Sequence, residues 1–154
     1  MKTKKTPLEM TAEQTNDIVG YFQEGLHAVK GEYRSKIVCT NPRALTGSIN
    51  IDEATRSAYP DANRWDYAIE YDNETYFVEF HPAATGNVSE MMNKFKWLKS
   101  WLRTKAPIMN ELKPKCRPAY YWIATGRVKI LKGSSESRQL AQIGLIPQKM
   151  IVLD

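Results

Sequence analysis

A pair of β-strands joined by a tight turn is the feature of this sequence that most restricts its fold. The segment RWDYAIEYDNETYFVEFH, residues 64–81, alternates apolar and polar residues on both sides of its centre, which is the period of a half-buried strand. The central triplet DNE is typical of a turn between antiparallel strands. We therefore expect a β-hairpin made of residues 64–71 and 75–81.

Two carboxylates should meet at the open end of this hairpin. Asp66 lies early in the first strand and Glu79 late in the second, so antiparallel pairing brings the two positions together. His81 shares a strand face with Glu79. Paired carboxylates repel each other unless a cation lies between them. Their oxygen atoms suit Mg²⁺ or Mn²⁺, and an added imidazole nitrogen favours Mn²⁺ or a softer metal. Such an ion can orient a water molecule and stabilise charge on a phosphodiester.

The same residues also have simpler interpretations. Glu79 and His81 fit an ion pair on a solvated strand face, and Asp66 fits a turn residue at the start of a strand. Pro82 has no backbone N–H, so the strand must end or become an edge strand after His81. A functional site at the end of the sheet is compatible with that constraint.

The rest of the chain predicts one α/β domain over residues 11–154, preceded by a flexible basic tail of residues 1–10. The sequence TAEQ at Thr11 is a capping box and predicts a first helix that runs to near Gly31, because apolar residues follow at helical spacing. The later helices are expected over residues 88–104 and 134–143.

Strands complete the expected order of elements. Besides the hairpin, they are expected around residues 37–39 and over 47–52, 119–125 and 148–153. The resulting α-β-β-β-α-β-α-β order predicts a mixed central β-sheet of about five strands, flanked by helices on both faces.

Charge and composition leave several partners open. The 154 residues include 22 Lys and Arg against 17 Asp and Glu, a net charge of +5, which permits nucleic acid as a partner without requiring it. Lys96, Lys99 and Arg103 form a basic face on the expected helix 88–104, which fits either phosphate binding or ordinary solvation. Two distant cysteines match no metal-ligand spacing and favour reduced thiols in a cytoplasmic protein. Since no apolar run is long enough to span a bilayer, no membrane partner is expected.

The hairpin sequence and the order of elements resemble the PD-(D/E)XK nuclease superfamily, which has the restriction-endonuclease-like fold, over about residues 12–125. In that pattern an Asp opens one strand, and an acidic-x-Lys motif lies on the next. The resemblance implies a metal-dependent nuclease in which Asp66 and Glu79 hold Mg²⁺ or Mn²⁺. It also implies a further acidic ligand from the first helix, for which Glu24 and Glu13 are the candidates. The implied partner is nucleic acid, DNA in preference to RNA, and a homodimer is a candidate assembly.

The sequence departs from this pattern at its lysine, because His81 stands at the lysine position. Three interpretations follow. His81 acts as a general base near neutral pH or as a metal ligand. Alternatively, the lysine has moved to Lys94, which lies on the semi-apolar flank of helix 88–104 and could stabilise charge from there. In the third, catalysis has been lost and the fold serves as a module that binds nucleic acid or protein without turnover.

Overall fold

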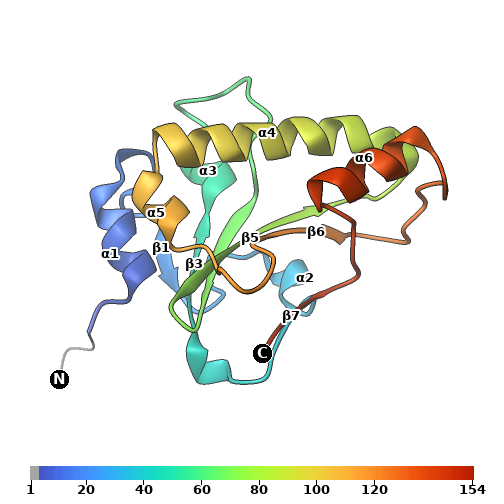
Figure 1. Cartoon of the computed structure of the whole chain (residues 1–154). Coiled ribbons are helices and arrows are strands. Elements are labelled where there is room, and N and C mark those ends of the chain that lie inside the picture. The colour runs from blue at the N-terminus through green and yellow to red at the C-terminus, as the bar shows by residue number, and fades with distance from the viewer. Residues whose placement is uncertain (1–3) are drawn as a thin grey trace.

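The predicted hairpin lies in a five-stranded mixed sheet in the computed structural model, which describes residues 4–154 (Figure 1). Its two strands are β4, Tyr67–Tyr71, and β5, Glu74–His81, and they pair antiparallel with Tyr67 opposite Val78. The turn between them is made by Asp72 and Asn73, whose φ angles are 52° and 64°. Two positive φ angles are what a two-residue type I′ turn requires, and Asn and Asp tolerate them well. The hairpin prediction is therefore confirmed.

The sheet follows the order β1-β3-β4-β5-β6. The neighbours of the hairpin are β1 at Phe22–Glu24, β3 at Leu45–Asn50 and β6 at Tyr120–Ala124. The first four strands pair antiparallel, whereas β6 runs parallel to β5. A parallel neighbour needs a crossover connection, and the helix α4, Val88–Thr104, lies in the chain between β5 and β6. Helix α4 and strands β3 to β6 match the predicted elements closely.

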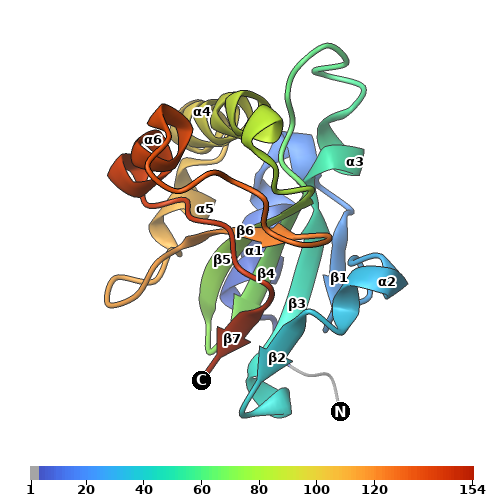
Figure 2. The same ribbon diagram turned by 90° about the vertical axis from the view of Figure 1, so that its right-hand side faces the viewer.

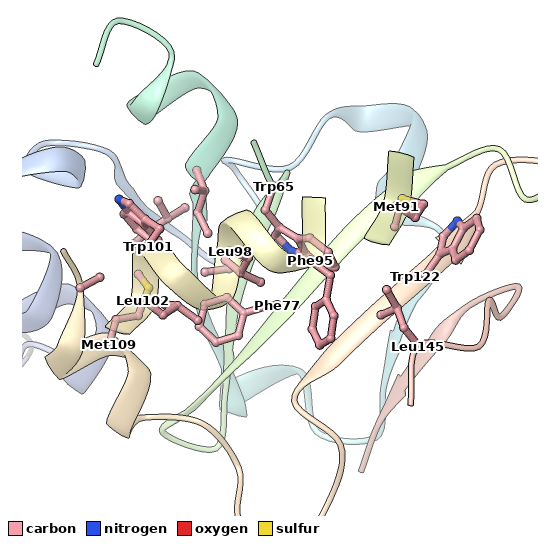
Figure 3. Packing of buried hydrophobic residues seen from close by; sticks show 14 of the residues in the cluster. Trp65, Phe77, Met91, Phe95, Leu98, Trp101, Leu102, Met109, Trp122 and Leu145 are labelled. Atoms are coloured by element: carbon pink, nitrogen blue, oxygen red, sulfur yellow. The ribbon is translucent and has the colours of Figure 1, made fainter. Parts of the chain in front are cut away.

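Most of the helices cover one face of this sheet (Figure 1). Besides α4, they are α1 at Pro7–Gln14, α3 at Ile51–Thr55, α5 at Pro107–Glu111 and α6 at Ser135–Ile143. Figure 3 shows Phe77 of β5 among Phe95, Leu98 and Leu102 of α4. These apolar side chains fix the rotation of α4 about its axis, and so decide which of its polar residues face the sheet. No helix in residues 4–154 is long and apolar enough to cross a membrane.

The opposite face of the sheet carries a second, smaller sheet, which corrects the predicted arrangement. Strand β7, Ile151–Leu153, was expected in the central sheet but pairs in parallel with β2, Ile37–Cys39. This ribbon packs against apolar side chains of β4 and β5, and the short helix α2, Gly31–Arg34, lies next to β1 in Figure 2. The ring of Tyr33 in α2 stacks on Phe80 of β5 with the centroids 4.4 Å apart. Short 3₁₀ turns lie at Asn16–Ile18, Pro42–Ala44 and Thr85–Asn87.

The predicted first helix is wrong in its position. Helix α1 begins five residues earlier, where the side chain of Thr6 accepts a hydrogen bond from the backbone N–H of Glu9. The sequence TPLE is thus the true capping signal, with proline at the first helical position. Gly20 and Gly25 then adopt positive φ angles of 85° and 54°, which an α-helix does not allow. The apolar spacing over residues 18–29 therefore belongs to a loop and to edge strand β1.

Part of the predicted basic tail belongs to the folded domain. Residues 7–10 belong to α1, and Leu8 is fully buried. The backbone N–H of Leu8 donates to the carboxylate of Glu70, a buried residue of β4, at 2.9 Å. Residues 1–3 of the predicted tail lie outside the described residues. Helix α1 is thus attached to the sheet through its first turn.

Candidate functional site

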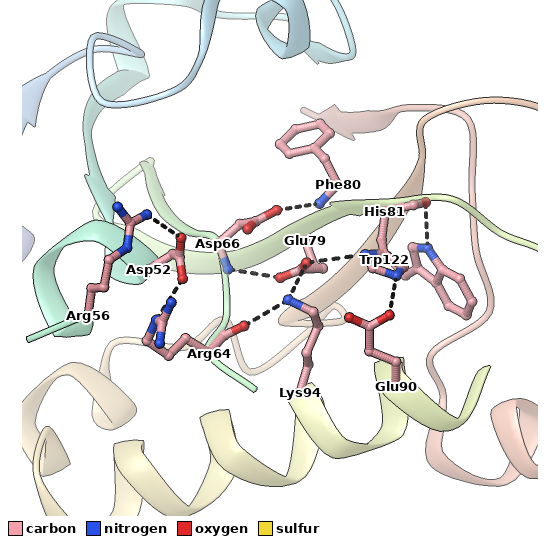
Figure 4. A network of polar contacts seen from close by, with 10 residues as sticks. All are labelled: Asp52, Arg56, Arg64, Asp66, Glu79, Phe80, His81, Glu90, Lys94 and Trp122. Carbon is pink, nitrogen blue, oxygen red and sulfur yellow. Dashed lines mark hydrogen bonds and ion pairs between the residues drawn. The ribbon is translucent and has the colours of Figure 1, made fainter. Parts of the chain in front are cut away.

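Asp66 and Glu79 face each other at one end of the hairpin, as the sequence predicts. The backbone N–H of Asp66 donates to Glu79 Oε1 at 2.9 Å, and the N–H of Phe80 donates to Asp66 Oδ2 at 3.0 Å (Figure 4). This reciprocal pattern extends the β4–β5 ladder by one residue through side chains. It follows that Asp66 is more than a turn residue, because its carboxylate is held against the neighbouring strand.

Lys94 reaches this pair of carboxylates from α4. Its Nζ lies 3.1 Å from Glu79 Oε2 and donates to the backbone carbonyl of Arg64 at 3.0 Å (Figure 4). Met91 and Leu98, three residues before and four residues after Lys94, are fully buried, so α4 presents Lys94 to the sheet beside its apolar stripe. The position is that of the relocated lysine considered from the sequence.

His81 lies on the other side of Glu79 and contacts a second residue of α4. Its Nε2 is 3.0 Å from Glu90 Oε2, and its Nδ1 is 3.9 Å from Glu79 Oε2. The indole Nε1 of Trp122 donates to the backbone carbonyl of His81 at 3.0 Å. Glu90 is not among the site residues predicted from the sequence. The available signal was its spacing, because Glu90 precedes Lys94 by four residues and so shares its helix face.

Burial is the main influence on the charges in this cluster. Glu79 is only 1% exposed, so it is not the solvated surface residue of the simpler interpretation. Burial raises the pKa of its carboxyl well above the usual 4.5, and the nearby charge of Asp66 adds to that rise. Burial likewise raises the pKa of Asp66, although the Phe80 N–H and the charge of Lys94 oppose the change.

The amine of Lys94 responds in the opposite way to its surroundings. Burial disfavours its charged form, but the carboxylates of Glu79 and Asp66 outweigh burial and raise the pKa of the amine. Lys94 therefore stays protonated, while one ammonium group cannot neutralise two carboxylates. If both carboxylates are ionised, the cluster has an excess negative charge, which either a shared proton or a further cation can neutralise.

The prediction that Glu24 supplies an acidic ligand from the first helix is wrong. Glu24 lies on β1 rather than on a helix, and it pairs with Gly47, which in turn lies opposite Glu70. Glu24 is therefore level with Glu70, which is four residues, or about 13 Å along the strand, from Asp66. The alternative, Glu13, pairs with Lys5 at 2.6 Å. Within residues 4–154, no three His, Cys, Asp or Glu side chains gather closely enough to hold a metal ion unaided.

The predicted basic face of α4 points away from the cluster. Lys96, Lys99 and Arg103 are exposed, and at 100° per residue they lie about 140–200° around the helix from Lys94. The ammonium group of Lys99 is also 5.1 Å from the ring centroid of Phe95. Nucleic acid bound to this face would thus lie on the far side of α4 from the two carboxylates.

The candidate site therefore consists of two carboxylates, one ammonium group and one imidazole, with Glu90 at its rim. Four of the five side chains come from residues that the sequence analysis selected: Asp66, Glu79, His81 and Lys94. The chain was compared with protein-family models, curated proteins and solved structures, and none of them matches it.

Proposed function

We propose that this chain is a divalent-metal-dependent nuclease-like protein that acts on nucleic-acid phosphodiesters. The proposal depends mainly on one observation: Lys94 Nζ lies 3.1 Å from Glu79 Oε2, and the other oxygen of the same carboxylate accepts a hydrogen bond from the backbone N–H of Asp66. The two acids and the lysine of the PD-(D/E)XK pattern are thus close together, although the lysine comes from α4. This convergence supports the resemblance, including the restriction-endonuclease-like topology.

The donor atoms of the cluster fit Mg²⁺ or Mn²⁺. Both ions prefer oxygen ligands, and Mg²⁺ is commonly bound by one or two carboxylates together with substrate phosphates. Asp66 and Glu79 supply such a pair. Burial is the main cause of their raised pKa values, and a cation between them would favour the charged forms that burial disfavours. When bound, the ion would supply Lewis-acid stabilisation and a polarised water molecule.

The other residues have roles that follow from their positions. The ammonium group of Lys94 is held by Glu79 and by the carbonyl of Arg64, so it can stabilise negative charge that develops on a phosphoryl oxygen. His81 directs Nε2 to Glu90, which leaves Nδ1 on the side of Glu79. From there the imidazole can accept a proton from water or complete the ligand set.

A second candidate function is favoured by the burial of Glu79. Its carboxylate is 1% exposed and already has an ammonium group beside it, so Lys94 neutralises it as a metal ion would. This arrangement suits a catalytically degenerate nuclease fold that binds a nucleic-acid or protein partner without turnover. The two candidate functions differ in whether a metal ion, in addition to Lys94, is needed to neutralise the carboxylates of the cluster.

A nuclease screen distinguishes the two candidates. The wild-type chain is incubated with supercoiled plasmid, single-stranded DNA and duplex RNA, in Mg²⁺, in Mn²⁺ and in EDTA. We expect cleavage products with at least one of the two ions and none in EDTA. Binding of these substrates with no cleavage in either ion would instead support the degenerate module, and neither binding nor cleavage would contradict both nucleic-acid functions.

A further inference from the structure

A hollow of about 330 Å³ lies at the carboxyl ends of the parallel strands β5 and β6. It is lined by the small residues Ala83, Ala84 and Gly126 and by the basic residues Arg127 and Lys129. Both basic side chains are exposed. Because the small residues have short side chains, a ligand can approach the backbone closely on that side.

Hydrogen bonds hold the two loops that form this hollow in place. The N–H of Lys129 donates to the carbonyl of Ala83 at 2.7 Å, and a parallel bridge joins Ala84 to Lys129. The N–H of Leu131 donates to Thr85 Oγ1 at 3.2 Å. The hollow is therefore formed before any ligand binds, which limits the ordering cost of binding.

The hollow adjoins the candidate site. The N–H of Thr125, which lines the hollow, donates to the backbone carbonyl of His81 at 3.3 Å. The indole of Trp122 donates to the same carbonyl, as Figure 4 shows. His81 thus presents its imidazole to Glu79 and Glu90, while its own carbonyl anchors the wall of the hollow.

The charge around the hollow is positive. The loop of residues 125–133 contains three basic residues and no acidic residue, and the facing loop of residues 82–87 contains no charged residue. Lys36 adds a further positive charge, because its Nζ donates to the carbonyl of Ala124 at the end of β6. By contrast, a larger hollow of about 560 Å³ beside β1 is lined by both Lys4 and Lys5 and both Glu9 and Glu24. The hollow next to the site is the one suited to an anion.

We propose that this hollow, rather than the basic face of α4, binds the phosphodiester backbone of a nucleic acid whose neighbouring phosphate reaches the carboxylate cluster. The inference rests on the proposed function for the choice of ligand, but the binding step can be measured by itself. Arg127 offers a planar, bidentate donor set to a phosphate, and Lys129 a mobile ammonium group. Successive phosphates along one strand would then pass from the hollow to His81.

The test is a binding measurement in EDTA, where no cleavage can occur. Fluorescence anisotropy would follow three labelled probes of about 20 nucleotides per strand, namely duplex DNA, single-stranded DNA and duplex RNA, over a series of salt concentrations. The first variant is Arg127→Glu/Lys129→Glu. The matched control is Lys96→Glu/Arg103→Glu, which also exchanges one arginine and one lysine on an exposed surface. Each pair of reversals lowers the net charge from +5 by the same amount.

We expect the hollow variant to lose at least about tenfold in affinity for its best probe and to reduce the salt slope by about two, since two phosphate contacts disappear. The control should lose less than about threefold, through long-range charge alone. Equal losses in both variants, a larger loss in the control, or no binding by the wild-type chain would overturn the inference. The preferred probe identifies whether the backbone is DNA or RNA.

The same variants separate this inference from the nuclease proposal. If the wild-type chain binds through the hollow but cleaves nothing in Mn²⁺ or Mg²⁺, the hollow stands and the nuclease function fails. If the wild-type chain cleaves and Arg127→Glu/Lys129→Glu cleaves with an unchanged KM, the nuclease function stands and the hollow is overturned.

Discussion

Replacing Lys94 with methionine is expected to destabilise the folded chain by about 3 kcal/mol. Methionine keeps much of the side-chain volume but leaves the buried carboxylate of Glu79 without its cation, and removal of one partner from a buried ion pair commonly costs about 3–5 kcal/mol. The lower end applies because Glu79 can take up a proton. For a chain of this length, the melting temperature should fall by about 6–12 °C.

The loss of stability in Lys94→Met should depend on pH in a defined direction. Burial and Asp66 already raise the pKa of Glu79, and removal of the lysine raises it further. The folded variant then binds a proton more tightly than the unfolded chain, so its free energy of unfolding falls as pH rises above the ordinary carboxyl range. We expect a larger deficit relative to wild type at about pH 8 than at about pH 5, measured by urea denaturation.

The double variant Glu79→Gln/Lys94→Met provides the control, because it removes both charges and retains the shape of both side chains. It should be more stable than Lys94→Met alone, with a coupling free energy of about 1–3 kcal/mol. If Lys94→Met unfolds with the wild-type free energy at both pH values, the contact between Lys94 and Glu79 does not contribute to stability, and the cluster described above is wrong.

Replacing Glu79 with glutamine is expected to abolish metal-dependent cleavage and to weaken Mn²⁺ binding by at least about tenfold. The substitution preserves the shape of the side chain and removes one of the two carboxylates that we propose as metal ligands. Such ligands bind a metal ion through charge as well as geometry. Cleavage would be followed on the substrate that the nuclease screen selects, and binding by calorimetry.

Glu70→Gln is the matched control for this experiment. Glu70 is also a fully buried glutamate of the hairpin, but its carboxylate accepts hydrogen bonds from Leu8 N and Thr46 Oγ1, away from the cluster. The Glu70→Gln variant tests whether the loss of any buried carboxylate in this sheet abolishes activity. Equal loss of cleavage in Glu70→Gln and Glu79→Gln would contradict a specific role for Glu79.

Local sequence signals predicted the parts of the fold that depend on neighbouring residues. The DNE turn, the alternation around it and the apolar stripe of α4 each act within a few residues, and all three appear in the structure as expected. The prediction of the first helix was wrong because it relied on a capping box at Thr11 and on apolar residues at helical spacing, although two glycines interrupt that segment. Their left-handed φ angles are visible only once β1 is paired with β3.

The candidate site was predictable only to the extent that the hairpin register determined it. Asp66 and Glu79 could be paired by counting residues from the turn, and the structure places them in contact. The contacts of Lys94 and Glu90 depend instead on how α4 is rotated over the sheet, which is set by distant residues such as Phe77. The predicted position of Glu24 was wrong because it too depends on distant residues, through the pairing of β1 with β3.

Calorimetric titration of Mn²⁺ into the wild-type chain and into Glu79→Gln, at two pH values, measures whether Asp66 and Glu79 bind a metal ion. We predict about one ion per wild-type chain, with tighter binding at higher pH because the carboxylates must lose a proton before they bind the ion, and little or no binding to the variant. Mn²⁺ binding that is identical in the two proteins, or that does not change with pH, would contradict a metal site at Asp66 and Glu79.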